Sequence, residues 1–371
     1  MTTYFIRRFL LMIPTLIGVT IVAFLITRIV PGGPIEREIM RIRQAAVSGE
    51  GGPAAGTNID DPTSDIPPEA IAELEKEYGF DKPWYTAYFL WLKKVALFDL
   101  GESYYYKEPV GDMIIERFPV SLVFGLTGFV LSYLVCIPLG ILKALRHGTL
   151  FDFVSSAIVF IGYSIPGWAM GALLLLLLSS GRFFEIFPAG EIKTKSYDKL
   201  PAVIQKFEPR DDVSDEFGTF EWEKLSPFSK IVDRAYHMAL PVFCYMLSGF
   251  ATLTVLTKNS LMENMGQDYV RTAFAKGLAP RRVIFLHTLR NSLIPIATGL
   301  GHALGLLMAG SYLIEWIFNI DGLGYFGFTA ILQRDYMVVL GVLVVNTVLM
   351  LVGNIFSDML YALIDPRIRF E

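Results

Sequence analysis

The sequence lacks the motifs with which enzymes bind nucleotides or activate a nucleophile. It contains no G-x-x-x-x-G-K-[ST] loop for nucleotide phosphates, and neither the H-E-x-x-H nor the G-x-S-x-G motif of hydrolases. Ser248 and Ser311 lie in apolar segments without a base at a recognisable spacing, which disfavours an intramembrane hydrolase. The sequence therefore predicts that this chain has no catalytic residue and binds no cofactor or metal ion itself.

Ionisable residues inside apolar segments are rare and are candidates for function. The histidines have no metal-ligand spacing among themselves: His147, His237, His287 and His302. His302 alone lies within an apolar run, where it is either functional or a neutral side chain hydrogen-bonded to a neighbouring helix. Glu315 and Asp358 are interpreted as residues near helix ends. The shortage of carboxylates at mid-membrane positions disfavours proton or sodium coupling.

Residues 267–280 have the start and stop signals of a short helix between two apolar runs. Asp268 is expected to cap the start of the helix. Gly277 is expected in the left-handed position just after its end, and Pro280 follows shortly. The spacing predicts a helix of about two turns.

The composition of this short helix suits contact with another protein. The small side chains of Ala273 and Ala275 would let another surface approach closely, and Arg271 and Lys276 could bind its polar rim. An ordinary positively charged loop is the alternative.

The elements around this helix are those of an integral membrane protein. Of the 371 residues, 53% are hydrophobic and only 18% are charged, with a mean hydropathy of +0.48. A helix needs roughly 20 apolar residues to cross a bilayer core of about 30 Å. Six runs meet this requirement, at residues 9–27, 120–142, 153–180, 238–257, 293–318 and 338–363. Pro166 interrupts the third run and is expected to break or kink its helix.

The charges of the connecting segments predict the orientation, because short cytoplasmic loops retain Lys and Arg. Basic residues prevail in 143–152 and 258–290, whereas acidic residues prevail in 31–119 and 181–236. Both termini are then cytoplasmic, and the two long acidic loops face outward. The net charge of −4 gives no basic excess for binding nucleic acid.

Residues 84–98 form an aromatic, amphipathic segment within the first outer loop. The pattern predicts a helix that lies along the outer membrane interface or packs against the spans. A helix of a soluble domain is the alternative.

At the short helix the sequence resembles a known family. The segment Y-V-R-T-A-F-A-K-G-L followed by H-T-L-R-N-S-L-I-P resembles the cytoplasmic coupling motif of ABC importer permeases in the dipeptide/oligopeptide family. Similar matches extend over most of the chain, including I-R-R-F-L-L-M-I-P-T-L, F-D-L-G-E-S, G-Y-S-I-P-G-W, I-F-N-I-D-G-L-G-Y and Y-A-L-I-D-P-R-I. The details resemble most the Yej-type permease of the microcin C and oligopeptide importer. Arg271-Thr272-Ala273 stands where the general consensus has Glu-Ala-Ala.

The resemblance implies an all-α integral membrane protein with six transmembrane helices, a type I ABC importer permease core and two extended extracytoplasmic loops. The implied organisation is an N-terminal transmembrane helix at 1–30, an extracytoplasmic loop region at 31–116, the permease core at 117–363 and a cytoplasmic tail at 364–371. The core would include the extracytoplasmic insertion 181–236 and the cytoplasmic coupling loop 258–290.

The resemblance also implies a transport subunit of the bacterial cytoplasmic (inner) membrane without its own ATPase site. It would carry oligopeptides from an extracytoplasmic binding protein to the cytoplasm. The sequence leaves open whether the cargo includes peptide antibiotics such as microcin C. Its other partners would be a second homologous permease subunit and two cytoplasmic ATPase subunits, or one two-domain ATPase, which bind ATP and Mg.

Two sets of residues take a role from the resemblance. The coupling helix would contact one ATPase through Tyr269, Arg271, Thr272, Ala273, Ala275, Lys276 and Gly277. An outer loop at the mouth of the transport path would be shaped by Gly322, Leu323 and Gly324. The acidic outer loops would either dock the binding protein or only keep the outer face soluble.

A stand-alone channel or ion-coupled secondary transporter is the alternative function. Such a protein would work without nucleotide or partner chains. The shortage of charge at mid-membrane positions disfavours it.

Overall fold

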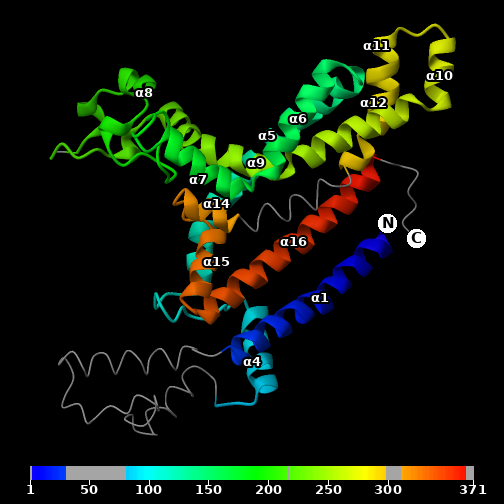
Figure 1. Cartoon of the computed structure of the whole chain (residues 1–371). Coiled ribbons are helices and arrows are strands. Elements are labelled where there is room, and N and C mark those ends of the chain that lie inside the picture. Colours follow the sequence, from blue (N-terminus) through cyan, green and yellow to red (C-terminus); the bar gives the residue numbers. More distant parts are fainter. Residues whose placement is uncertain (1, 31–80, 216, 298–310, 365–371) are drawn as a thin grey trace, which may run out of the picture. The chain divides into compact units, whose positions relative to one another are not determined.

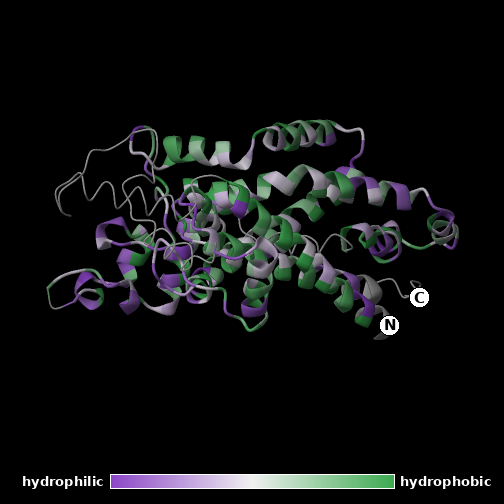
Figure 2. Cartoon of the chain, turned by 90° about the horizontal axis from the view of Figure 1, so that it is seen from below, coloured by the Kyte–Doolittle hydropathy of each residue, from purple (hydrophilic) through white to green (hydrophobic). Residues whose placement is uncertain are grey.

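The computed structural model describes residues 2–30, 81–215, 217–297 and 311–364, which form helices joined by turns, with no strand among these residues (Figure 1). Four helices are long and apolar enough to cross a membrane: α1 (Thr2–Ile29), α5 (Val110–Leu145), α9 (Pro227–Met265) and α16 (Tyr336–Ile364). Hydrophobic residues make up long stretches of the helices (Figure 2). The all-α membrane class is confirmed.

A broken helix pair supplies a further apolar element. α6 (Leu150–Ser164) and α7 (Gly167–Leu178) differ in direction by 95°. Ile165 and Pro166 between them have extended backbone angles, because proline has no N–H to donate and disfavours helix in the residue before it. The break therefore lies where the sequence analysis expects it. Both helices pack against α9.

The predicted span at 293–318 is described only in part. Residues 298–310, with His302 among them, lie outside the described residues, and so do residues 31–80, which make up most of the predicted first outer loop. The described end of this run forms a helix of only six residues, α14 (Tyr312–Ile317). The described parts of the chain thus contain four candidate spans, or five when α6 and α7 count as one.

Contacts within the chain divide it into two compact units, which are taken here one at a time. The larger comprises Arg117–Tyr325 with Leu349–Glu371, and the smaller comprises Thr2–Glu116 with Phe326–Val348.

In the smaller unit, α4 (Trp84–Ala96) packs against α1. Its Tyr88 hydroxyl lies 2.9 Å from Thr20 Oγ1 in a buried hydrogen bond. The shared apolar cluster comprises Phe24, Tyr88, Trp91, Leu340 and Val344. Of the alternatives for residues 84–98, packing against the long apolar helices is confirmed.

In the larger unit, the main core joins α5, α9 and α14 and the turn after α14. Its buried residues are Phe124, Leu240, Val242, Cys244, Ile314, Phe318 and Ile320, and side chains of α7 pack against them. These are residues of the predicted apolar runs, together with the turn that follows the fifth run.

The insertion 181–236 folds around a small core of its own. This core comprises Leu200, Ile204, Val213, Trp222 and Leu225. At its base the fully buried carboxylate of Asp233, on α9, accepts hydrogen bonds from Trp222 Nε1 at 2.8 Å and from the N–H of Thr194 at 2.9 Å. The described residues of this insertion therefore form a folded module with its own core, which we call the 181–236 module.

Candidate functional site

The short helix predicted after the fourth apolar run is α10 (Asp268–Ala275). It begins after Gln267, whose extended backbone occupies the N-cap position without a side-chain hydrogen bond. The prediction that Asp268 caps the helix is therefore wrong. Asp268 is the first helical residue, and its Oδ1 lies 3.6 Å from Nη1 of Arg271 on the next turn. Its charge still favours the helix, because it lies at the positive end of the helix dipole.

Gly277 ends α10 through a left-handed turn, with φ at +77°. Its N–H donates to the carbonyl of Phe274 at 2.9 Å, and the N–H of Leu278 donates to the carbonyl of Ala273 at 3.4 Å. These two bonds form a Schellman motif, which satisfies carbonyls at the helix end. Glycine adopts this conformation without the penalty of roughly 1–2 kcal/mol that a Cβ adds. The predicted stop position is confirmed.

One face of α10 packs against its own chain. Val270 and Ala273 are buried in a cluster with Val283, and Leu278 packs against it. Ala273 is only 9% exposed. The interpretation of Ala273 as a point of close approach for another protein is therefore wrong, because its methyl group contacts residues of the same chain.

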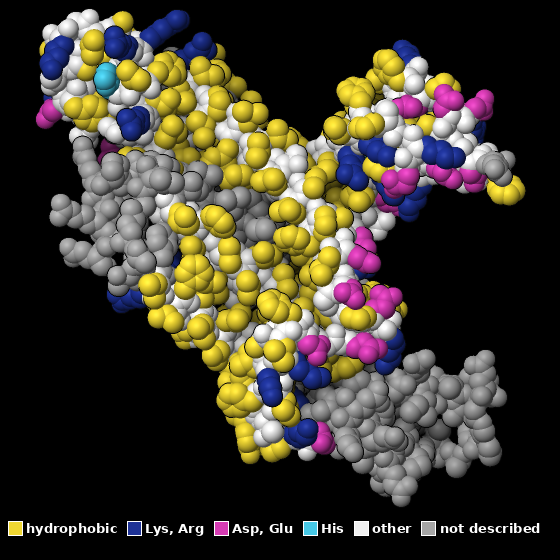
Figure 3. Space-filling model, turned by 180° about the vertical axis from the view of Figure 1, so that it is seen from behind, with side chains coloured by type: hydrophobic (Ala, Val, Ile, Leu, Met, Phe, Trp, Pro, Cys, Tyr) yellow, Lys and Arg dark blue, Asp and Glu magenta, His cyan; other side chains and the backbone are white. Residues whose placement is uncertain are grey.

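The outer face of α10 and the turn after it present the other predicted contact residues. These are exposed to the surroundings: Tyr269, Arg271, Thr272, Ala275, Lys276 and Gly277. Phe274, which the sequence analysis did not single out, is 45% exposed between them. Figure 3 shows dark blue Lys and Arg side chains gathered at this end of the larger unit, beside exposed hydrophobic side chains. The surface combines cations with aromatic rings, which suits a protein partner.

α10 and the elements after it form a helical hairpin, residues 268–292. Its second arm consists of α11 (Pro280–Arg282), the π-helical η4 (Val283–Thr288) and α12 (Leu289–Ser292). The buried hydroxyl of Ser260, on α9, donates to the carbonyl of Ser292 at 2.8 Å. The 268–292 hairpin is thus attached to α9 at both of its ends.

The predicted outer-loop residues surround a buried carboxylate. Glu315, on α14, is 0% exposed, and its side chain accepts hydrogen bonds from the N–H of Tyr325 at 2.8 Å and from Ser121 Oγ at 3.3 Å. Ser121 Oγ in turn accepts a bond from the N–H of Leu323 at 2.7 Å. Glu315 does lie near the end of its helix, as expected, and it is in addition buried among hydrogen-bond donors. Its partner Ser121 lies 194 positions away, so the sequence offered only the signal of an acid in an apolar run.

Gly322 and Gly324 are required by this close packing. A Cβ on Gly322 would lie 2.5 Å from Ser121 Oγ and 2.7 Å from Glu315 Oε2, and a Cβ on Gly324 would lie 2.9 Å from the nitrogen of Tyr312. Leu323 between them is fully buried. The structure thus brings together the three predicted outer-loop residues, and all three pack within the larger unit.

The 181–236 module contains a cavity of about 560 Å³. Its walls come from Ser179, from side chains within residues 185–200, from Tyr236 and His237 on α9, and from Asn319. The ring of His237 is held by a hydrogen bond between Nδ1 and the carbonyl of Gly190 at 2.9 Å. The cavity lies apart from the residues that the sequence analysis placed in a site.

Comparison with known proteins places the chain in a family. Residues 136–370 match the model of the family described as binding-protein-dependent transport system inner membrane component. The peptidoglycan transport system permease protein YejB of Agrobacterium fabrum is 37% identical over 100% of this chain and 99% of its own length. The inner membrane ABC transporter permease protein YejB of Escherichia coli O157:H7 is 36% identical over all of both chains. The dipeptide transport system permease protein DppB of Escherichia coli K12 is 33% identical over all of both chains. The chain belongs to the family of inner membrane components of binding-protein-dependent transport systems.

Proposed function

We propose that this chain is the membrane-spanning permease subunit of an ATP-driven importer of peptides, including peptide antibiotics such as microcin C. The observation that carries the proposal is end-to-end similarity to permeases named for the transport of dipeptides and of peptidoglycan. A peptide is the chemistry common to both cargoes. In this importer the chain receives its cargo from an extracytoplasmic binding protein and releases it to the cytoplasm.

The 268–292 hairpin is the contact for an ATPase subunit in this proposal. Its exposed face carries Tyr269, Phe274 and Lys276, and its buried face holds α10 in place. A short helix supported in this way transmits a displacement without bending. Two cytoplasmic ATPase subunits, or one two-domain ATPase, bind ATP and Mg and move the hairpin, and a second permease subunit completes the path.

The two faces of the membrane follow from the same proposal. The hairpin lies on the cytoplasmic side of the bacterial inner membrane, together with both termini. The 181–236 module and the loop at Gly322, Leu323 and Gly324 then lie outside, where the module offers the binding protein a preformed surface. Six spans, a core at 117–363 and an outer region at 31–116 complete the topology of a type I permease.

Purification in mild detergent tests the proposed assembly. The tagged chain should co-purify with a second permease and with two ATPase subunits, and the complex in liposomes should import peptide only when ATP and the binding protein are supplied. In the same liposomes, peptidoglycan-derived peptides, dipeptides and longer peptides should compete with one another for uptake, each in proportion to its affinity for the transporter. A chain that purifies as a lone homo-oligomer and conducts without nucleotide would instead be a channel or secondary transporter.

A further inference from the structure

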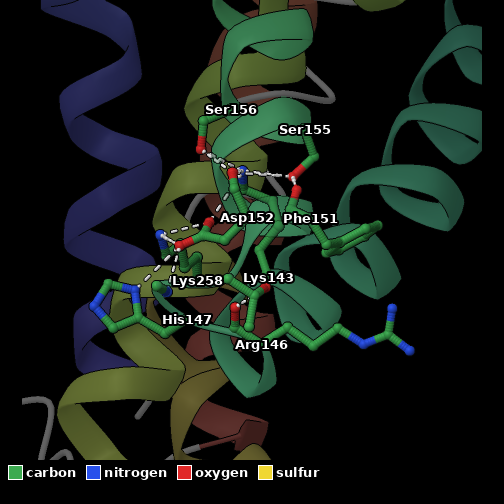
Figure 4. Close-up of polar contacts among 10 residues, drawn as sticks. Lys143, Arg146, His147, Phe151, Asp152, Ser155, Ser156 and Lys258 are labelled. Atoms are coloured by element: carbon green, nitrogen blue, oxygen red, sulfur yellow. Dashed lines mark hydrogen bonds and ion pairs between the residues drawn. The ribbon is translucent and has the colours of Figure 1, made fainter.

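A buried ionic cluster links three helices of the larger unit near the start of α6. Asp152, in the first turn of α6, is 6% exposed, and both of its carboxylate oxygens accept hydrogen bonds from Nζ of Lys258 on α9, at 2.7 and 2.8 Å. Nζ of Lys143, on α5, lies 3.4 Å from Asp152 Oδ1. Figure 4 shows these side chains converging on Asp152. We call this set, with the hydrogen-bonding residues named next, the Asp152 cluster.

Every charge in the Asp152 cluster is satisfied. The ammonium of Lys143, 1% exposed, donates to the carbonyl of Asp152 at 3.2 Å, to Ser155 Oγ at 3.0 Å and to Ser156 Oγ at 2.6 Å. Asp152 Oδ2 also accepts from the N–H of Gly148 at 3.2 Å and lies 3.2 Å from His147 Nδ1. Such a cluster holds its helices in one arrangement, because any other arrangement leaves an uncompensated charge away from water.

A stability role alone gives a weak reason for burying these charges. Replacing a buried ion pair by well-packed apolar residues is often neutral or stabilising, whereas a buried pair fixes geometry. Here the ion pair fixes the position of α6 relative to α9. Lys258 lies on α9, which ends at Met265 and is joined to the 268–292 hairpin through Gly266 and Gln267. Asp152 lies on α6, which leads into the 95° break before α7.

Among the described residues, no other polar side-chain contact joins α6 to the second half of α9. At the far end of this chain of contacts, Ser260 on α9 is bonded to the carbonyl of Ser292 at 2.8 Å. A displacement of the hairpin therefore reaches α9 through its covalent connection and Ser260. It reaches α6 through the polar contact of Lys258 with Asp152 and through the packing of α6 against α9.

We propose that Asp152 is a positioning residue that makes the 268–292 hairpin and α6 move as one body, through its two-oxygen contact with Lys258. The inference rests on the proposed function, in which the ATPases move the 268–292 hairpin. It states how that movement reaches α6. It adds a residue 116 positions before α10 to the coupling apparatus, outside the loop that contacts the ATPase.

The sharpest variant is Lys258→Gln. It removes the contact to α9 but leaves Asp152 paired with Lys143, so α5 and α6 stay joined and no carboxylate is left without a cation. Lys258→Arg restores a cation as the conservative variant. Asn259→Ala, an exposed neighbour on the same turn of α9, is the matched control.

The readout is the distance between two spin labels in the complete transporter in lipid nanodiscs. Labels at Ile161→Cys on α6 and Arg281→Cys on α11 occupy exposed positions, whereas the native Cys136 and Cys244 are buried. Transport and ATP hydrolysis are measured on the same variants without labels, and thermal unfolding confirms that each variant is folded.

In the wild type the label distance should be the same in the nucleotide-free and the ATP-trapped complex. In Lys258→Gln it should change on trapping, and the peptide transported per ATP should fall by roughly 2- to 30-fold, while Lys258→Arg and Asn259→Ala behave as the wild type. The inference is overturned if the wild-type distance itself changes on trapping, or if Lys258→Gln matches Asn259→Ala. Failure of the proposed function would be seen earlier, as a wild-type complex without ATP-dependent peptide uptake.

Discussion

The carboxylate of Glu315 accepts a hydrogen bond from the backbone N–H of Tyr325 at 2.8 Å, across a turn of ten residues. This contact makes the loop between them a packed structure rather than a flexible connection. Two glycines let the backbone approach the acid closely enough for the bond to form, since a Cβ on either would lie within about 3 Å of Glu315 Oε2. The loop between Glu315 and Tyr325 therefore has one well-defined shape.

Gly322→Ala tests how closely the loop is packed. The new methyl group would lie 2.5 Å from Ser121 Oγ, so backbone or side chains must shift. The free energy of unfolding in detergent should fall by about 1–3 kcal/mol, the range for overpacking a core. Gly249→Ala is the control, because no atom lies within 4 Å of its Cβ position. Equal stability of Gly322→Ala and the wild type would contradict the packing described here.

The apolar runs predicted α1, α5, α9 and α16 because membrane thickness imposes a length that a sequence can be searched for. The ends of these helices were less predictable. α9 begins eleven positions before the predicted start at 238, since Asp233 is satisfied by Trp222 and Thr194 of the 181–236 module. Such contacts are not visible in local composition.

In the candidate site too, features set by single residues could be predicted, whereas contacts between separate segments could not. The stop of α10 at Gly277 follows from the backbone freedom of one residue, so the sequence alone indicates it. The burial of Ala273 depends on Val283, and that of Glu315 depends on Ser121, 194 positions away. Pairings over such distances in the chain leave no local pattern.

Gly277→Val should disrupt the end of α10 without a steric clash, because the space around its Cβ position is empty and only the positive φ is unfavourable. The helix loses its Schellman motif at a cost of roughly 1–2 kcal/mol. We expect a membrane-inserted protein whose peptide uptake per ATP is reduced in liposomes. Gly277→Asn should retain uptake, since asparagine tolerates this conformation. Gly266→Ala, at a negative φ of −78°, is the control, and loss of uptake there would show that any change in this loop suffices.

Ala273 and Ala275 separate the two faces of α10. Ala273→Leu should overpack the cluster with Val270 and Val283 and lower the stability of the hairpin by about 1–3 kcal/mol, seen as faster hydrogen exchange over residues 268–292. Ala275→Leu, on the exposed face, should leave exchange in the free subunit unchanged and weaken co-purification of the ATPase. The reverse pattern would show that α10 binds its partner through the opposite face.

Glu208 gives the 181–236 module a dependence on pH. Hydrogen bonds from the Ser226 side chain, then from Ser229 and the Ser226 backbone, hold the pKa of Glu208 below its ordinary value, against the opposing effect of burial. Its Oε1 lies 3.1 Å from the nitrogen of Ser226 and 2.8 Å from Ser229 Oγ, at the start of α9. A carboxyl group with a lowered pKa in the folded state stabilises the fold above its unfolded pKa of about 4.3, and this contribution is lost as the pH falls further.

Glu208→Gln should therefore lower the stability of the module at pH 7 and flatten its loss of stability as the pH falls below the unfolded pKa of about 4.3, because the variant has no proton to take up there. The measurement is the rate of proteolysis within residues 200–230 by an acid-tolerant protease, as a function of pH, in detergent. Asp211→Asn removes an exposed carboxylate of the same module and is the control for net charge. If both variants changed the pH profile equally, the effect would come from the overall charge of the module, and the bonds from Ser226 and Ser229 would have no special role.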